Sequence, residues 1–399
     1  MIPELRSRYN AAFTDARYAA FTRELSRAMY WPVDFRVAES PLFLDEPTTR
    51  ALVAAADDLT RQLATPEFRA HAATAVPPHL AVPHETAWPH FLCIDFALCH
   101  DEAGRVLPQL IELQGFPTVA CWQVLQASAY RAHFPGIPPE FTTYFGGLDE
   151  ERYFDALRTA MLGDCPAEQV VLLEIEPDKQ KTRIDFACTH NFLNVRPVCL
   201  SQVRQQGSQL YHEVGGREVP IRRIFNRVIF DELLRRPDFR PGFNLRDERV
   251  QVEWAGHPNW YFRISKHSLP FLRGRYVPDC HLVSSLGSDF PADLGHYVLK
   301  PLYSFAGLGV DIAPTAEKLA TLERPAEWIL QRKVAYAPLL QTPDGPAKAE
   351  IRLIFAGDGT GMPMLVNNLV RLTKGAMHGV DFNKGKTWVG ASCAFHPVV

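Results

Sequence analysis

A lysine followed by a glycine-containing turn is the part of this sequence with the clearest chemical meaning. The apolar run 297–299 leads to Lys300, Gly307 and Gly309 follow in a turn, and residues 310–312 predict a returning strand. Glycines let backbone N–H groups approach phosphate oxygens, and a lysine adds a positive charge. The segment therefore indicates phosphate binding, although a solvated strand end is the commoner explanation for such a segment taken alone.

Two arginines on neighbouring predicted strands could supply further positive charge. Residues 349–356 and 363–372 each predict a long strand. Arg352 lies in the first strand and Arg371 in the second, so pairing of the strands would bring both guanidinium groups to one sheet, where they can bind phosphate oxygens. The plainer alternative for Arg352 is an ion pair with Glu350 or another neighbour in the sheet.

Two more polar residues lie in the same half of the sequence. Lys266 stands near the start of the predicted helix 265–272. Gln331 ends the short predicted strand Trp328-Ile-Leu-Gln, which could present its backbone edge to an adenine ring. Taken in order along the chain, these lysines, this strand and the two arginines are hard to explain by chance.

A predicted hairpin nearer the N-terminus carries side-chain oxygens. Strands at 91–98 and 106–113 flank a turn, and they carry Asp95, Glu112 and, just beyond, Gln114. Glu112 and Gln114 share one face because side chains alternate along a strand, and Asp95 lies on the adjacent strand. Mg²⁺ prefers such oxygens together with nucleotide phosphates. The alternative is a solvated hairpin face with ordinary acidic residues.

The chain divides into three regions by the pattern of its predicted elements. Region 1–150 combines helices with this hairpin. Region 151–255 alternates strands and helices, which predicts a small, mostly parallel α/β domain. Region 256–399 mixes both element types as an α+β unit.

The bulk composition excludes several classes of protein. The 399 residues are 47% hydrophobic and 22% charged, so we expect a packed core rather than extensive disorder. The net charge of −3 does not suggest binding to nucleic acid or to a membrane surface. The 8 cysteines form no C-x-x-C pair, and no long apolar run or leader is visible. We therefore expect free thiols and a cytoplasmic location.

The ordered set of residues resembles the ATP-grasp superfamily, and in particular the circularly permuted type found in the synthetase domain of glutathionylspermidine synthetase. That family's hairpin has the pattern R-x-D-F, then L-x-E-x-N-x-x-x-P-T. Here the segments are Cys93-Ile-Asp-Phe and Leu110-Ile-Glu-Leu-Gln-Gly-Phe-Pro-Thr. Ser265-Lys-His-Ser-Leu-Pro resembles the family's N-K-x-x-L-P motif. The resemblance extends over roughly residues 90–399 at low identity. Cys93 replaces an arginine and Gln114 an asparagine.

The resemblance implies an α+β fold in which two lobes clamp ATP, and a set of residue roles. It implies that Mg²⁺ is held by Asp95, Glu112 and Gln114. It implies that the nucleotide phosphates are bound by Lys266 and Lys300 with Gly307 and Gly309, and that Gln331 lies beside the adenine. Arg371 would lie at the transferring phosphoryl group, with Arg352 as its substitute. The implied activity is an ATP- and Mg²⁺-dependent ligase that joins a small-molecule carboxylate to an amine through an acyl phosphate and releases ADP. A kinase-like phosphotransferase and a non-catalytic nucleotide-binding protein are the alternatives. The sequence names neither the acid nor the amine, nor an oligomeric state.

Overall fold

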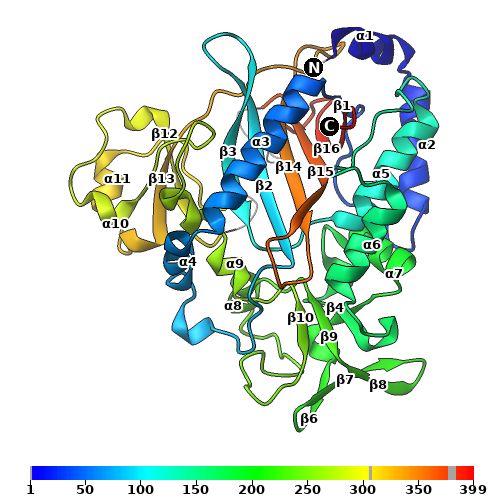
Figure 1. Cartoon of the computed structure of the whole chain (residues 1–399), viewed down its shortest axis with the longest axis vertical. Helices are drawn as coiled ribbons and strands as arrows, with labels where there is room; N and C mark the ends of the chain where they lie inside the picture. The colour runs from blue at the N-terminus through cyan, green and yellow to red at the C-terminus, as the bar shows by residue number, and fades with distance from the viewer. Residues whose placement is uncertain (1, 305–307, 376–382) are drawn as a thin grey trace.

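A computed structural model describes residues 2–304, 308–375 and 383–399 of the chain (Figure 1). Gly307 therefore lies outside the described residues. Within these ranges the strands form five sheets, and helices are packed around them in a mixed α+β fold. All 8 cysteines are free and buried, as we expected for thiols without paired spacing. The helices in the described ranges are all too short or too polar to cross a bilayer.

The largest sheet joins the N-terminal hairpin to strands from the C-terminal part of the chain. Its strand order is β16-β15-β14-β2-β3, and all neighbours are antiparallel. The predicted hairpin is confirmed, and its first strand pairs directly with β14, with Asp95 opposite Arg352. The strand bounds are β2 Phe91–His100, β3 Val106–Gln114, β14 Lys348–Ala356, β15 Met364–Thr373 and β16 Gly390–Ser392.

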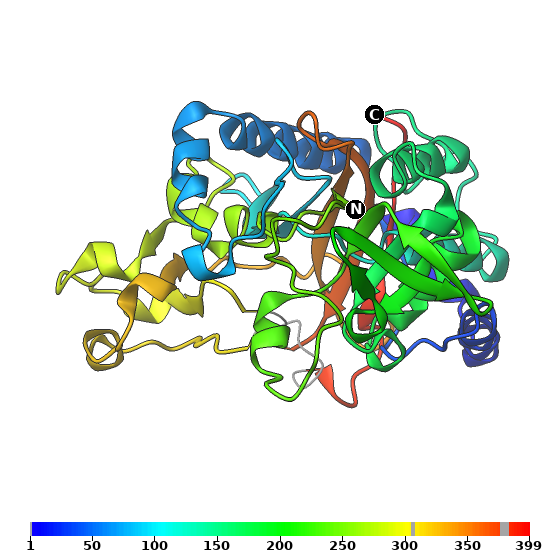
Figure 2. The ribbon, with the colours of Figure 1, turned by 90° about the horizontal axis from the view of Figure 1, so that it is seen from below.

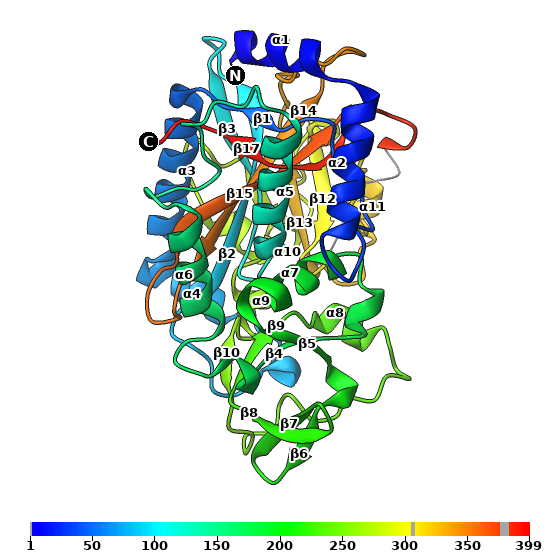
Figure 3. The same ribbon diagram turned by 90° about the vertical axis from the view of Figure 1, so that its right-hand side faces the viewer.

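One helix covers each face of this sheet. Apolar residues recur at helical spacing after Pro47, and these residues form α3 (Glu46–Leu63), whose first turn is capped by the side chain of Asp45. Its apolar face packs on alternate strand residues such as Ile94 and Ile351. Helix α5 (Ala120–His133) lies on the opposite face (Figure 3).

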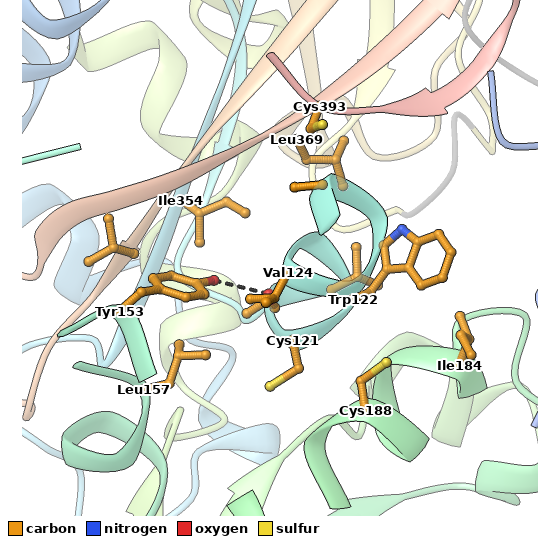
Figure 4. Packing of buried hydrophobic residues seen from close by; sticks show 14 of the residues in the cluster. Cys121, Trp122, Val124, Tyr153, Leu157, Ile184, Cys188, Ile354, Leu369 and Cys393 are labelled. Atoms are coloured by element: carbon orange, nitrogen blue, oxygen red, sulfur yellow. Dashed lines mark hydrogen bonds between the residues drawn. The ribbon is translucent and has the colours of Figure 1, made fainter. Parts of the chain in front are cut away.

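The α5 side of the sheet is sealed by a large hydrophobic cluster (Figure 4). Val124 of α5 packs with Ile354 and Leu369 of the sheet in this cluster. Tyr153 comes from α6 (Glu150–Met161) and donates a 3.0 Å hydrogen bond to the carbonyl of Ala120. That bond satisfies a hydroxyl that is otherwise fully buried. The cluster covers only part of this face, and polar residues occupy the rest.

A parallel sheet forms the predicted small α/β unit. Its order is β10-β9-β4-β5, and α7 connects β4 to β5. A hairpin turn at Gly215 and Gly216 joins β7 to β8, which project with β6 at one end of the molecule (Figures 1 and 2). The bounds are β4 Val170–Glu174, α7 Arg183–Leu193, β5 Arg196–Cys199, β6 Arg204–Gln206, β7 Gln209–Val214, β8 Arg217–Ile221, β9 Arg223–Asn226, α8 Phe230–Leu234 and β10 Glu253–Ala255.

The segment 221–230 does not form one continuous strand. Ile221 ends β8, and the following strand, β9, stops at Asn226. There the Asn226 side chain accepts a 3.1 Å bond from the backbone N–H of Val228. This local turn competes with continuation of the strand.

A third sheet, β11-β13-β12, forms a smaller lobe beside the largest sheet (Figure 1). Residues 310–312 do not form the expected returning strand. They contribute only one antiparallel bridge, between Leu299 and Asp311. The remaining bounds are β11 Cys280–Leu282, β12 Tyr297–Pro301, β13 Trp328–Arg332, α1 Pro3–Ala12, α2 Asp15–Arg27, α4 Pro66–Ala73, α9 Trp260–Arg263, the 3₁₀ helix η5 Lys266–Phe271, α10 Val283–Leu286 and α11 Ala316–Ala320, with β1 Leu42–Phe43 paired to β17 Ala394–Phe395.

Two buried histidines make the stability of this fold sensitive to acid. Burial lowers the pKa of His90 and of His257 to about 4 in each case, and the charge of Arg223 also acts on His90. Nε2 of His257 donates to the carbonyl of Pro83, and its Nδ1 accepts the N–H of Asn259, so a second ring proton would displace that donor.

The unfolded chain takes up these protons below pH 6.5, while the folded chain resists them, so stability is lost as pH falls from about 6.5 towards 4. Each histidine should cost about 2 kcal/mol of unfolding free energy between pH 7.5 and pH 5. Urea unfolding of the wild-type chain and of His257→Gln at both pH values tests this. We expect His257→Gln to lose less stability on acidification; an equal loss in both proteins would contradict the assignment.

Candidate active site

A pocket of about 220 Å³ opens between the largest sheet and the segments that follow α9 and β12. One wall comes from three strands of the sheet. The other comes from α9, η5 and the residues after β12. The lining residues are Glu112, Leu113, Gln114, Arg352 and Arg371 on the sheet side, and Tyr261, Ser265, Lys266, Leu302, Tyr303 and Ser304 opposite.

Strand register explains why charged residues meet on this face. Arg352 lies opposite Asp95, and Asp95 lies opposite Glu112, so the three form one row across β14, β2 and β3. Two residues before Arg352 on β14, Glu350 lies opposite Arg371 of β15. Cross-strand neighbours are close enough for their side chains to interact directly. Two arginines that are nearly 20 residues apart in the sequence are thereby held side by side.

Asp95 is the centre of this arrangement. Its side chain is only 1% exposed. Arg352 donates from Nε to Oδ1 at 2.6 Å and from Nη2 to Oδ2 at 2.7 Å. Arg371 donates from Nη2 to Oδ2 at 2.6 Å and also contacts Glu350. The buried carboxylate therefore fixes both guanidinium groups, that of Arg352 by a bidentate contact and that of Arg371 by a single one.

Glu112 is the carboxylate that the pocket leaves accessible, with a side chain 27% exposed. Its Oε2 lies 3.8 Å from Nζ of Lys266, and its Oε1 lies 3.7 Å from Nη2 of Arg352. Burial alone would raise the pKa of Glu112, but the charges of Lys266, Arg352, Arg371 and Lys300 outweigh burial and lower it. Four cations therefore act on one ionised carboxylate.

A bulge in β3 positions Lys300 near this group. The pairing register shifts so that Asp95 faces Glu112 while Phe96 faces Leu110, which leaves Ile111 as the extra residue. The carbonyl of Ile111 accepts a 3.4 Å bond from Nζ of Lys300. Burial lowers the pKa of Lys300, although the charge of Glu112 acts in the opposite direction.

Gln331 lies beside Lys300 rather than at a free strand edge. Its Oε1 accepts a 2.6 Å bond from Lys300, and its Nε2 donates to the carbonyl of Leu110 at 3.3 Å. Because β13 is the central strand of its sheet, β11 and β12 pair with both of its edges. The expectation that this strand presents a free backbone edge is therefore wrong, and Gln331 contacts the site through Lys300.

The 3₁₀ helix η5 places Lys266 across the pocket. Ser265 caps this helix by accepting the N–H of His267. Nζ of Lys266 donates a 2.6 Å bond to the carbonyl of Ser304, which follows β12. The end of β3 and α9 approach each other closely at Gly115. Only glycine fits there, because a Cβ at position 115 would lie 2.7 Å from the carbonyl oxygen of Trp260.

Comparisons with known proteins find a similar structure but no protein that is similar in sequence. No protein-family model matches the sequence, and no curated protein matches it. Among solved structures, a glutathione synthetase-like effector from Globodera pallida in its apo form aligns with a TM-score of 0.57. The alignment covers 100% of this chain and 99% of that chain, at 11% identity. This chain therefore has a mixed α+β fold like that of this glutathione synthetase-like protein. At such low identity the likeness concerns the fold alone.

The resemblance of the sequence to the ATP-grasp superfamily implies a nucleotide and Mg²⁺, and the pocket offers fewer metal ligands than the sequence suggested. Both oxygens of Asp95 are bound by arginines, so a metal there would have to displace them. Glu112, whose side chain is partly exposed, and Gln114 both lie on the pocket wall. No cluster of three or more His, Cys, Asp or Glu side chains suited to a metal occurs in the described parts of the chain. Two protein oxygens plus phosphates fit the usual Mg²⁺ environment.

The structure also shows residues that the sequence did not single out. Oγ1 of Thr118 accepts a 3.3 Å bond from Arg352, while its carbonyl accepts a 2.9 Å bond from Arg227. Tyr336 donates a 2.7 Å bond to Glu350, the carboxylate that contacts Arg371. Thr118 is the last residue of the hairpin motif quoted above, so the sequence offered a signal for it. Nothing in the sequence distinguishes Tyr336 from other tyrosines.

Of the two glycines predicted to bind phosphate after Lys300, the structure describes only Gly309. Gly307 is outside the described residues. Gly309 has a φ of +76°, and a Cβ there would lie 3.1 Å from Cγ of Pro301. Glycine is therefore favoured at 309 by both backbone conformation and space. Its predicted contact with phosphate stays a prediction.

Proposed function

We propose that this protein is an ATP- and Mg²⁺-dependent ligase that joins a small-molecule carboxylate to an amine. The observation that carries the proposal is the convergence of Lys266, Lys300, Arg352 and Arg371 on Glu112, in a chain whose fold is like that of a glutathione synthetase-like protein. Four cations around one ionised carboxylate, with two further carboxylates engaged by the arginines, leave an excess of positive charge. A polyphosphate is the ligand that such a pocket suits.

The chain's own residues would act mainly by position and charge. Lys266, which lines the pocket, and Lys300, whose charge acts on Glu112, would bind the nucleotide phosphates. Arg371 is held by Asp95 and Glu350 and is 37% exposed, so it can face the phosphoryl group being transferred. Glu112 and Gln114 would hold Mg²⁺, which supplies charge neutralisation between the phosphates when bound.

In the proposed reaction, an oxygen of the acid's carboxylate attacks the γ-phosphorus of ATP. The bond between that phosphorus and the bridging oxygen breaks, and ADP leaves. The amine nitrogen then attacks the carbonyl carbon of the acyl phosphate, forms the amide bond and loses a proton, and phosphate leaves. No nucleophilic side chain is required, and Cys93, which pairs with Gln114 in the sheet, is a buried thiol whose pKa burial raises to about 12.

We also propose the circularly permuted order of the ATP-grasp core. Its support is the largest sheet, in which β2 and β3 from the N-terminal part of the chain pair with β14 from the C-terminal part. In this arrangement the candidate metal-binding residues Glu112 and Gln114 precede the candidate phosphate-binding residues Lys266 and Lys300 along the chain.

A trapping experiment tests the reaction. Purified protein is given ATP, Mg²⁺ and a panel of small carboxylates, with hydroxylamine in place of the amine. We expect one class of acid to give a hydroxamate with equimolar ADP, and Arg371→Ala to slow this step by about 3 kcal/mol. AMP and pyrophosphate as products would contradict the acyl-phosphate path. A phosphate ester stable to hydroxylamine would identify a kinase instead.

A further inference from the structure

A second pocket, separate from the cationic one, lies between α4, the segment 85–88, α9 and Met362. Its volume is about 330 Å³, within the range of small-molecule sites. Most of its lining is apolar, and three aromatic rings contribute to it. The lining residues are Leu63, Phe68, Arg69, Ala72, Ala73, Glu85, Thr86, Ala87, Trp88, Trp260, Arg263, Ile264 and Met362.

The charges of this pocket are not balanced. Arg263 and Glu85 satisfy each other, with Nη2 of the arginine 2.9 Å from Oε2 and a second contact through Nε. Arg69 instead lies over the ring of Trp88, at 4.6 Å from the ring centroid. The one hydrogen bond of its guanidinium among the described residues is a 3.4 Å contact to the carbonyl of Ala87, and no ion pair joins this exposed group to a described carboxylate.

We propose that this pocket binds a small aromatic carboxylate. The ring would occupy the apolar volume beside Trp88 and Trp260, where aromatic stacking adds to the gain from burial. The carboxylate would pair with the guanidinium of Arg69, which already lies over an aromatic face and has no carboxylate partner of its own. A neutral ligand would leave Arg69 unpaired, and a cation would be repelled by it.

The position of the pocket connects it to the proposed nucleotide site. Trp260 and Arg263 of α9 line the aromatic pocket, whereas Tyr261 and Lys266 line the cationic pocket on the other side of the same short segment. A ligand that displaces Trp260 would therefore shift Lys266 and change the affinity for ATP. This coupling rests on the proposed function; the binding site itself does not.

Calorimetric titration of the full-length protein tests the site without requiring turnover. The probe is 2-naphthoate, with neutral 2-naphthamide as the comparison ligand. We expect naphthoate to bind at least about tenfold more tightly than the amide. Arg69→Gln should remove this preference while leaving the amide affinity unchanged. Ala73→Trp should fill the pocket and abolish the binding of both.

Arg61→Gln is the matched control, because Arg61 is an exposed arginine on the neighbouring helix and does not line the pocket. It should leave both affinities as in the wild-type protein, and equal melting temperatures should show that the variants are folded. Absence of naphthoate binding to the wild-type protein, or binding that survives Ala73→Trp, would overturn the proposal. Binding of naphthoate that fails to change ATP affinity would remove only the coupling to Lys266.

Discussion

Replacement of Asp95 by asparagine is expected to lower the free energy of unfolding by about 3–5 kcal/mol, the usual cost of removing one partner of a buried ion pair. Asp95 is nearly inaccessible and receives charge-assisted bonds from Arg352 and Arg371. Asparagine can accept one of these bonds but carries no charge. Both guanidinium groups would lose the group that fixes them, so turnover should fall as well. Urea unfolding at neutral pH measures the loss.

Glu112→Gln is the matched comparison, since Glu112 occupies the same row of the sheet but faces the pocket. No hydrogen bond of the described residues holds its carboxylate, so we expect unfolding free energy within about 1 kcal/mol of wild type. This variant should instead raise the Mg²⁺ concentration needed for half-maximal activity. If Asp95→Asn keeps wild-type stability and shifts the Mg²⁺ requirement as Glu112→Gln does, Asp95 is a metal ligand and the positioning role is wrong.

Lys300→Met is expected to weaken ATP binding by about 2 kcal/mol, or roughly thirtyfold, the scale of a hydrogen bond to a charged group. Lys300 is held by Gln331 and by the carbonyl of the bulged residue Ile111, and its charge acts on Glu112. Methionine keeps the length of the side chain but removes the charge. The fold should be retained, because burial already opposes the charged form of this lysine.

Lys318→Met provides a control for general charge effects. Lys318 lies in α11 of the same small lobe, is 48% exposed and pairs with Asp311. Its removal alters the net charge of the lobe equally but should leave ATP affinity unchanged. Equal losses in the two variants would show that the lobe attracts nucleotide only by its overall charge.

The local elements of this fold were predictable, because each depends on nearby residues. Helix α3 follows from the spacing of apolar residues after Pro47, and the β2–β3 hairpin follows from two apolar runs around a turn. Arg352 and Arg371 could be placed on paired strands for the same reason. The pairing of β2 with β14 lies beyond this reasoning, since more than 200 residues separate them and no local pattern specifies which strands meet.

The details of the candidate site depend on features with no sequence signature. A bulge at Ile111 turns a backbone carbonyl towards Lys300, and one inserted residue cannot be recognised from alternation alone. Asp95 resembles a metal ligand in the sequence, but burial beside two arginines gives it ion-pair partners that only the register shows. The contact of Gln331 with Lys300 likewise has no sequence signature, and the expected position of Gln331 near the nucleotide stays a prediction.

The central claim is that the pocket around Glu112 binds a nucleotide polyphosphate, and calorimetric titration of ATP and AMP into the wild-type and Lys300→Met proteins tests it most directly. With Mg²⁺ present, we predict that wild-type protein binds ATP at least about tenfold more tightly than AMP, since the cations would bind the β- and γ-phosphates. Lys300→Met should reduce this preference while leaving AMP affinity nearly unchanged. Equal affinities of the wild-type protein for ATP and AMP, or no binding of either, would contradict the account.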